Sequence, residues 1–286
     1  MAEKHPFIRV FTRRKTTEEA VPEESRRWTT AVVVAAGSST RMGGVSKQLL
    51  TLGGMPVLAR SLMALNEASL VDEIVIVSRE EDMLPFYDIC RRYEIEKAAV
   101  IIRGGATRQQ SVMIGVTQAR REAAYLAIHD GARPLVRPGR VDEVICEAYR
   151  YGAATAAVPV KDTVKLADDD GFIGATPDRS RLWNVQTPQV FERGLYIRAL
   201  RTAEEEGRDY TDDCQLVERL GARVKLVRGD YGNIKITTPE DIALAEGLLR
   251  NGGEQDGQMP AESGGPAFFD SPDGVAFDAA LFKEER

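Results

Sequence analysis

The chain contains little cysteine and little histidine. Its three cysteines, Cys90, Cys146 and Cys214, are widely spaced and form no CxxC pair, so neither a disulfide framework nor a cysteine-bound zinc site is supported. We expect all three thiols to be buried apolar groups. With only His5 and His129, a histidine-rich metal centre is also disfavoured. Any metal must therefore bind mainly to oxygen atoms, which favours Mg²⁺ or Mn²⁺ over zinc.

The sequence also lacks a long apolar run and an excess of basic residues. No uncharged segment approaches the roughly 20 apolar residues of a membrane-spanning helix. Residues 1–28 are charged and lack the apolar region of a signal peptide. The 38 basic and 44 acidic side chains give a formal net charge of −6, which argues against a general nucleic-acid-binding protein. We expect a cytoplasmic protein with neither nucleic-acid nor membrane partners.

Composition divides the chain into three parts. Residues 1–28 and 251–286 have no regular apolar periodicity, and we expect a disordered N-terminal extension and a flexible C-terminal tail. The tail contains apolar residues such as Phe268 and Phe277, which leaves open whether it docks on its own domain or on a partner. The length suits one large domain or two small ones, and we expect residues 29–250 between these parts to form one α/β domain.

Apolar segments alternate with segments of helical character through this middle part. Residues 29–36 form a continuous β-branched run, typical of a strand buried on both faces of a parallel sheet. Similar runs follow at residues 73–78, 98–102 and 124–129. A T-x-x-Q capping box at residues 107–110 opens one helix, and Thr238-Pro239 opens a last helix that we expect to end near Leu249. The alternation predicts an α/β fold with a Rossmann-like, mostly parallel sheet flanked by helices.

One segment interrupts the alternation. Residues 158–164 and 171–175 flank the sequence Asp-Asp-Asp-Gly, whose Asp-Gly step is typical of a hairpin turn. A two-stranded hairpin alone is marginally stable in water. We therefore expect a projecting β-arm, at about residues 158–178, that packs on a second subunit; the alternative is a hairpin lying on its own domain.

A loop of small and basic residues follows the first strand. It reads AAGSSTRMGG over residues 35–44 and continues to Ser46-Lys47-Gln48. In a doubly wound sheet, ligands bind beyond the carboxyl ends of the strands. Small residues there let backbone N–H groups approach a phosphate chain, and Arg41 and Lys47 add positive charge. The loop matches neither the Walker A motif nor the GxGxxG fingerprint, and the alternative is a turn with two surface cations.

Two further clusters follow later strands. Asp130, in His129-Asp130-Gly131-Ala132-Arg133-Pro134, can hold a hard divalent cation together with nucleotide phosphates, although a lone aspartate at a strand end is also a common cap or turn residue. We expect His129 to be a packed, hydrogen-bonded group rather than a base. Gly104-Gly105-Ala106-Thr107-Arg108 with Ser111 forms a glycine turn that opens the capped helix and can offer backbone groups to a nucleobase, although a helix start by itself needs no ligand.

Seven motifs follow one another in the chain: AAGSSTRMGG…SKQ, GGATRQQSV, HDGARP, PVKDTVK, DRSRLWNVQTPQVF, YTDD and NIKIT. Together they resemble the 2-C-methyl-D-erythritol 4-phosphate cytidylyltransferase family of the non-mevalonate isoprenoid pathway, over residues from about 30 to 249. The resemblance implies a homodimer joined through the β-arm. It also implies transfer of CMP from CTP to 2-C-methyl-D-erythritol 4-phosphate, a sugar-alcohol phosphate, giving CDP-methylerythritol and pyrophosphate, with Mg²⁺ or Mn²⁺ as cofactor.

The resemblance also implies a role for individual residues. The CTP phosphates would be held by Ala36, Gly37, Arg41 and Lys47, the cytosine by Gly105, Ala106 and Ser111, and the magnesium by Asp130. The alcohol-phosphate side would be lined by Arg133, Thr187, Thr211 and Lys235. Thr163 and Arg179, on or beside the arm, would reach into the neighbouring subunit's site. The catalytic residues would be Arg41, Lys47, Lys235 and Arg179.

Two departures from the family pattern concern the first loop. Ser46 stands where the family usually has proline, and Leu49 where an aromatic residue is common. Neither removes a proposed catalytic group. Two other functions stay open at this point: a ribitol 5-phosphate cytidylyltransferase, and a regulatory module that binds CTP without turnover.

Overall fold

The computed structural model describes residues 6–10, 27–37 and 46–252. The chain divides into two units, residues 1–249 and 250–286, and the fold below is that of the first. Arg41 and residues 253–286, which include most of the predicted C-terminal tail, lie outside the described residues. Among the residues that are described, no helix combines the length and hydrophobicity needed to cross a bilayer.

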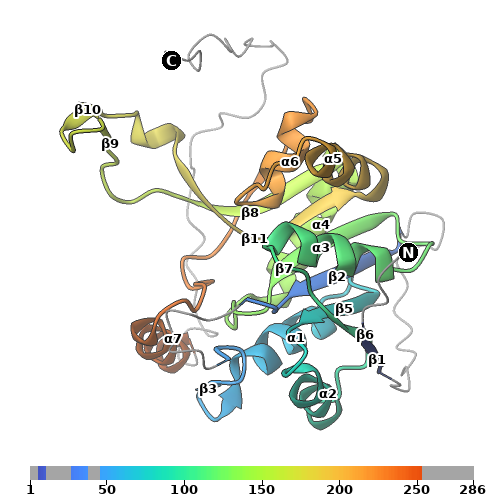
Figure 1. Cartoon of the computed structure of the whole chain (residues 1–286). Coiled ribbons are helices and arrows are strands. Elements are labelled where there is room, and N and C mark those ends of the chain that lie inside the picture. Colours follow the sequence, from blue (N-terminus) through green and yellow to red (C-terminus); the bar gives the residue numbers. More distant parts are fainter. Residues whose placement is uncertain (1–5, 11–26, 38–45, 253–286) are drawn as a thin grey trace. The chain divides into compact units, whose positions relative to one another are not determined.

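An eight-stranded sheet forms the centre of this unit, in the order β1-β6-β5-β2-β7-β11-β8-β12 (Figure 1). The strands are β1 (Phe7–Arg9), β2 (Thr29–Val34), β5 (Glu73–Ser78), β6 (Ala98–Arg103), β7 (Tyr125–Asp130), β8 (Ala153–Pro159), β11 (Trp183–Glu192) and β12 (Lys225–Arg228). Strands β6, β5, β2 and β7 pair in parallel, as do β8 and β12. Strands β1 and β11 are antiparallel to their neighbours. The predicted α/β fold with a mostly parallel sheet is confirmed.

Helices cover both faces of the sheet because alternate residues of each buried strand point to opposite sides. The helices are α1 (Val57–Glu67), α2 (Met83–Arg92), α3 (Arg108–Gln118), α4 (Pro138–Tyr151), α5 (Arg193–Glu205), α6 (Asp213–Arg219) and α7 (Pro239–Gly252). Ala31 and Val33 of β2 belong to a core cluster that includes residues of α1, α2 and α4. Val32 belongs to the opposite cluster, with residues of α3, α5 and α6. The fully buried central strand explains the continuous apolar run seen in the sequence.

The two helix starts predicted from the sequence, at residues 107–110 and 238–239, are found in the structure. The Thr107 hydroxyl accepts a hydrogen bond from the Gln110 amide at 3.2 Å and caps α3. Helix α7 begins at Pro239, but it extends to Gly252 rather than ending near Leu249. Among the cysteines, Cys90 and Cys214 are buried as expected. Cys146 is exposed, which corrects the expectation that all three thiols are buried.

The N-terminal extension contributes a strand to the sheet. Strand β1 pairs with β6 along one edge, with Ile8 opposite Ile101, and the next residue, Val10, is only 7% exposed. Residues 7–9 therefore depart from the disordered extension expected for residues 1–28. Pairing with β6 gives this short segment the hydrogen bonds and the apolar contacts that its own sequence is too short to indicate.

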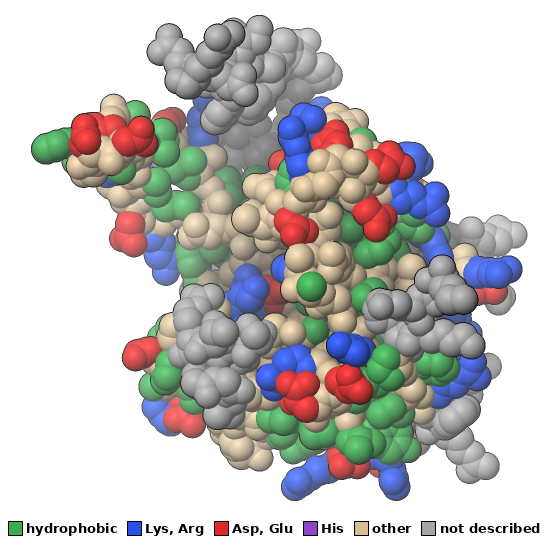
Figure 2. Space-filling model, in the orientation of Figure 1, with side chains coloured by type: hydrophobic (Ala, Val, Ile, Leu, Met, Phe, Trp, Pro, Cys, Tyr) green, Lys and Arg blue, Asp and Glu red, His purple; other side chains and the backbone are tan. Residues whose placement is uncertain are grey.

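The β-arm is present but shorter than predicted. Its two strands are β9 (Leu166–Ala167) and β10 (Ile173–Ala175), and Gly171 in the turn has φ +84°, which glycine adopts without strain. The predicted strand at residues 158–164 is wrong, because residues 158–159 belong to β8 in the central sheet and residues 160–165 form no strand. The arm projects from the body of the unit (Figure 1), and its tip carries hydrophobic side chains beside acidic ones (Figure 2).

Candidate active site

A buried carboxylate lies at the carboxyl edge of the sheet. Asp130, the last residue of β7, is 6% exposed and is approached by three cations. Its Oδ2 atom lies 2.9 Å from Lys235 Nζ and 3.4 Å from Arg133 Nε, and its Oδ1 atom lies 3.8 Å from Arg108 Nη2. Burial alone would raise the pKa of Asp130. The charges of Lys235, Arg108 and Arg133 outweigh burial and hold the pKa well below its ordinary value, so the carboxylate is ionised.

The neighbouring strand β11 and the loop after β12 contribute a second set of polar groups to this edge. The Thr187 hydroxyl accepts a hydrogen bond from the Asp130 amide at 3.1 Å and lies 3.0 Å from His129 Nδ1. The Asn233 side chain donates to the Thr187 carbonyl at 3.0 Å, and the Asn233 carbonyl accepts from Arg133 Nη1 at 2.7 Å. These bonds fix Asp130, Thr187 and Arg133 relative to one another.

His129 is enclosed within this network. It is fully buried, and burial lowers its pKa to about 4, so the ring is neutral at pH 7. A neutral, buried imidazole that is hydrogen-bonded to Thr187 is the packed group that the sequence predicted.

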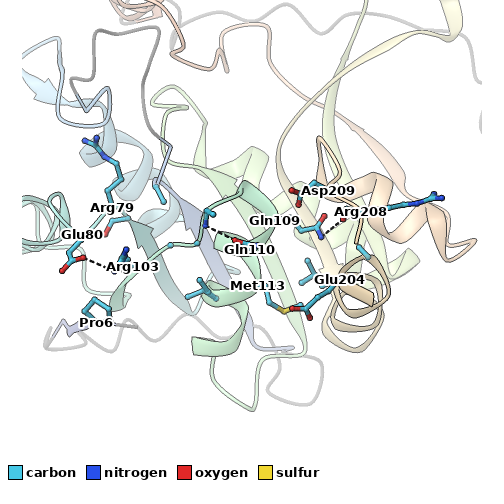
Figure 3. Close-up of a pocket in the computed structure, with 18 of the residues that line it drawn as sticks. Pro6, Arg79, Glu80, Arg103, Gln109, Gln110, Met113, Glu204, Arg208 and Asp209 are labelled. Carbon is cyan, nitrogen blue, oxygen red and sulfur yellow. Dashed lines mark hydrogen bonds and ion pairs between the residues drawn. The ribbon is translucent and has the colours of Figure 1, made fainter. Parts of the chain in front are cut away.

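A cavity of about 1110 Å³ lies at the carboxyl ends of β2, β5 and β6, and residues of α3 and α5 also line it (Figure 3). Ala36, at the end of β2, and the turn 104–106 between β6 and α3 line its wall. The turn is fixed from within: Ser111 Oγ accepts from the Gly105 amide at 3.1 Å, and Gln110 Oε1 accepts from the Ala106 amide at 2.9 Å. A Cβ at Gly104 would lie 2.7 Å from the Ala36 Cβ, so only glycine permits this close approach.

Comparison with known proteins assigns the chain to one enzyme family. The profile of 2-C-methyl-D-erythritol 4-phosphate cytidylyltransferase matches residues 29–251. The chain belongs to this family. It is 50% identical to the cytidylyltransferase of Caldanaerobacter subterraneus over 214 residues, covering 74% of this chain and 94% of that protein. Over 213 residues it is 47% identical to the enzyme of Desulforamulus reducens, covering 74% and 91%.

Solved structures agree with this assignment. The 4-diphosphocytidyl-2C-methyl-D-erythritol synthase of Anaerococcus prevotii is 31% identical, with a TM-score of 0.73 over 80% of this chain and all of that one. The cytidylyltransferase of Thermus thermophilus is 34% identical, with a TM-score of 0.64 over 77% of this chain and 98% of that one. The chain is therefore a nucleotidyltransferase, a 2-C-methyl-D-erythritol 4-phosphate cytidylyltransferase of isoprenoid biosynthesis. The resemblance drawn from the seven motifs is confirmed.

Eight of the residues expected to serve the cytidylyltransferase reaction fall into two groups. Asp130, Arg133, Thr187 and Lys235 lie together at the carboxyl edge. Ala36, Gly105 and Ala106 line the cavity, and Ser111 holds the turn between them. Gly37 is exposed at the end of β2, and Lys47 is half-buried in the turn after the first loop. Arg41 lies in residues 38–45, outside the described residues.

Three other predicted residues lie apart from the Asp130 cluster. Thr211 is exposed at the start of α6, where its hydroxyl contacts Gln215. Thr163 is exposed on the arm, and Arg179 donates to the Lys161 carbonyl at 2.8 Å from the short 3-10 helix Arg179–Arg181. Among the described residues, no hydrogen bond or ion pair joins Thr163 or Arg179 to the cluster.

Sequence reasoning assigned no role to Arg108, which contacts both Asp130 and Asp213. Its Nη2 atom lies 2.6 Å from Asp213 Oδ2, and Asp213 also accepts from the Tyr196 hydroxyl at 2.5 Å. Arg108 begins α3, where the helix dipole disfavours a cation. That unfavourable position is the signal in the sequence, because an arginine there needs acidic partners from elsewhere in the chain.

Proposed function

We propose that the Asp130 cluster and the adjoining cavity form one active site, in which 2-C-methyl-D-erythritol 4-phosphate takes CMP from CTP. One observation carries the proposal: Lys235, Arg133 and Arg108 converge on a buried carboxylate at the carboxyl edge of a parallel sheet. Ligands of such sheets bind at this edge. Because three cations share Asp130 and Asp213, positive charge is in excess there, which suits two substrates that both carry phosphate.

The cavity side of the site would hold CTP. Ala36 and Gly37 offer backbone groups at the end of β2, and Lys47, with Arg41, adds the charge that a triphosphate needs. The amides of Gly105 and Ala106 already donate to Ser111 and Gln110. The carbonyl groups of this turn are therefore the groups left to read a base. Carbonyl acceptors match the exocyclic amino group of cytosine, whereas uracil presents a carbonyl at that position.

The carboxyl-edge side would hold the sugar-alcohol phosphate. Arg133 and Lys235 would supply charge and Thr187 a hydroxyl. Thr211, which precedes α6 outside the Asp130 cluster, would contribute a second hydroxyl from the rim of the site. Thr163 and Arg179 would come from the arm of a second subunit. The arm supports this homodimer, because Leu166, Phe172 and Ile173 are 56%, 71% and 67% exposed on a two-stranded hairpin that has little core of its own.

The reaction follows from the charges that these residues present. A phosphate oxygen of the alcohol phosphate attacks the α-phosphorus of CTP, a new P–O bond forms, and the bond to the β-phosphate oxygen breaks as pyrophosphate leaves with the electron pair. The attacking oxygen is already anionic, so no protein base is needed, in keeping with a neutral, buried His129. The work of Arg41, Lys47, Lys235 and Arg179 is to offset repulsion between the substrates and stabilise charge on the leaving group. Alignment of the two substrates supplies the remainder of the rate acceleration.

The residues at the edge fit a magnesium ion held mainly by the substrates. Among the described residues, no cluster of three or more His, Cys, Asp or Glu side chains could hold a metal, so the protein would supply the Asp130 carboxylate alone. Phosphate and water oxygens would complete the shell that Mg²⁺ prefers, and Mn²⁺ accepts the same ligands. When bound, the ion neutralises charge on the phosphates and the leaving pyrophosphate.

Asp130→Asn should raise the Mg²⁺ concentration that gives half-maximal activity by about tenfold or more, which corresponds to about 1.4 kcal/mol. The amide keeps the shape of the side chain but loses the charge that attracts a hard cation. The measurement is a Mg²⁺ titration of turnover. Asp72→Asn is the matched control, since Asp72 is also buried but accepts from the Thr29 amide at the opposite end of β2. An unchanged titration for Asp130→Asn would remove Asp130 as the metal ligand.

Pyrophosphate release tests the proposed function as a whole. We expect release from CTP with 2-C-methyl-D-erythritol 4-phosphate, and release from ATP, GTP or UTP that is slower by about tenfold or more in kcat/KM, because a site built to hydrogen-bond one base leaves polar groups unpaired with another. Equal turnover with ATP would contradict the assignment of the turn 104–106 to the base. Equal turnover with ribitol 5-phosphate would favour the other alcohol, and CTP binding without release would favour a regulatory module.

A further inference from the structure

A second buried carboxylate lies close to the proposed site without belonging to it. Asp82 directly precedes α2 and is 3% exposed. A residue at this position commonly caps its own helix, but in the described structure the Asp82 side chain makes no capping hydrogen bond. Its Oδ2 atom instead accepts from Arg79 Nε at 2.8 Å and from Ser46 Oγ at 3.1 Å. The carboxylate therefore joins two segments that follow the neighbouring strands β2 and β5.

The Ser46 partner fixes the backbone next to Lys47. Ser46 is 6% exposed, and its carbonyl accepts from the Leu49 amide at 3.0 Å, which closes a turn around Lys47. Gln48, on the other side of Lys47, is 2% exposed, and its carbonyl accepts from the Leu58 amide at 2.9 Å. The Ser46 hydroxyl also lies 3.3 Å from Gln48 Oε1, but it has one proton, and a carboxylate is the stronger acceptor. The turn is thus held by α1 on one side and by Asp82 on the other.

The Arg79 partner belongs to the wall of the cavity. Arg79 lines the cavity at the end that also holds Glu80 and Arg103, whereas Arg208 and Asp209 lie at the far end (Figure 3). Its Nη1 atom lies 3.0 Å from Glu81 Oε1, so two carboxylates determine its direction. Asp82 consequently couples the wall of the proposed CTP cavity to the turn that carries the proposed phosphate-binding lysine.

We infer that Asp82 is a positioning residue for CTP binding, which holds Ser46 and Arg79 so that the turn carrying Lys47 is preformed before the nucleotide arrives. The inference rests on the proposed role of Lys47. Preforming a charged turn removes part of the ordering that a ligand would otherwise have to impose, and this appears as tighter binding. Asp82 does not touch the substrates; it acts through Ser46 and Arg79.

The same sheet contains a matched control at its opposite end. Thr30 Oγ1 donates to Glu73 Oε2 at 2.9 Å, and Arg120 Nε donates to Glu73 Oε1 at 3.1 Å. This hydroxyl, carboxylate and arginine repeat the Ser46, Asp82 and Arg79 arrangement, also between β2 and β5, but at the amino ends of the strands. Removing the Thr30 hydroxyl therefore removes a comparable buried hydrogen bond, but one that lies far from the proposed site.

The test compares CTP dissociation constants, measured calorimetrically without the second substrate, with unfolding midpoints. Ser46→Ala should weaken CTP binding about fivefold, and Asp82→Ala about tenfold or more, the range of a hydrogen bond to a charged group. The double variant should bind CTP no more weakly than Asp82→Ala, because both changes remove the same Ser46–Asp82 hydrogen bond.

Two control variants accompany these changes. Ser46→Thr, which keeps the hydroxyl, should bind CTP within about twofold of the wild type. Thr30→Val should lower the unfolding midpoint as Ser46→Ala does, with CTP binding within about twofold of the wild type.

Three results would overturn the inference: wild-type CTP binding by Ser46→Ala, effects of the two single changes that multiply in the double variant, or equal weakening by Thr30→Val. Ser46→Ala carries no charge change, so it decides the matter even if Asp82→Ala does not fold. Lys47→Ala separates this inference from the proposed function. Weak CTP binding by Lys47→Ala with normal binding by the Ser46 and Asp82 variants would reject only the positioning role, whereas normal binding and turnover by Lys47→Ala would reject the proposed role of Lys47 itself.

Discussion

Lys47→Ala should lower kcat by about 100-fold or more and leave the fold intact. A preorganised charge that meets the developing negative charge of a transition state is worth about 10²- to 10³-fold in turnover. Lys47 is half-buried, so its charge is less screened than that of an exposed lysine. The measurement is kcat at saturating CTP and alcohol phosphate, with circular dichroism and an unfolding midpoint to verify the fold.

Lys97→Ala is the control for this change. Lys97 is half-buried to a similar degree and donates to the Ala68 carbonyl at 2.6 Å, at the amino end of β6, away from the proposed site. Its removal should leave kcat within about twofold of the wild-type value, as expected for a residue that does not contact substrate. For Lys47→Ala, a higher KM for CTP with an unchanged kcat would contradict the catalytic role and leave Lys47 a binding role only, since it would mean that Lys47 binds substrate and transition state equally.

Mixing two inactive variants, Lys47→Ala and Arg179→Ala, should restore about a quarter of the wild-type activity. If the arm crosses a two-fold axis, Lys47 and Arg179 of one chain serve different sites. A mixed dimer then has one site with both residues intact and one site with neither. Random reassociation gives about half mixed dimers, with one of two sites restored. The measurement is turnover after co-refolding, with mixed dimers verified by mass spectrometry.

The control for this experiment mixes Lys47→Ala with Lys235→Ala. Both lysines are proposed to serve the site of their own chain, so no site in a mixed dimer would be intact and activity should stay at the level of the separate variants. The absence of any gain with Arg179→Ala, when mixed dimers are present, would mean that Arg179 acts in its own subunit or outside catalysis. A gain with Lys235→Ala would instead separate Lys47 and Lys235 into different sites.

The parts of the fold that the sequence predicts are those set by local patterns. The strand predicted at residues 73–78 is β5 with the same bounds, because a strand covered on both faces is apolar throughout. The Thr107 cap was predicted because its partner, Gln110, is three residues away. The exposed thiol of Cys146 could also have been predicted, since Val141, Val144, Ile145 and Ala148 form the buried stripe of α4 and Cys146 lies off it.

The parts that it does not predict depend on residues distant in the chain. Strand β1 is stabilised by β6, about 90 residues later, and its three residues carry no periodicity of their own. Val158 pairs with Asn184 in the central sheet, so the start of the arm is decided by β11. In the candidate site, the resemblance supplied Asp130 and Lys235, but Arg108 could not be assigned without its partner Asp213, which lies 105 residues away.

Strand β1 also bears on how the protein behaves at high concentration. Without β1, β6 would be the edge strand of the sheet. Its six residues would then present unpaired backbone amides and carbonyls, on which another chain can pair and start aggregation. With β1 in place, the strand at that edge is three residues long. Short edge strands are one of the means by which β-sheets avoid such pairing. Residues 7–9, which precede the family match at residue 29, thereby favour colloidal stability.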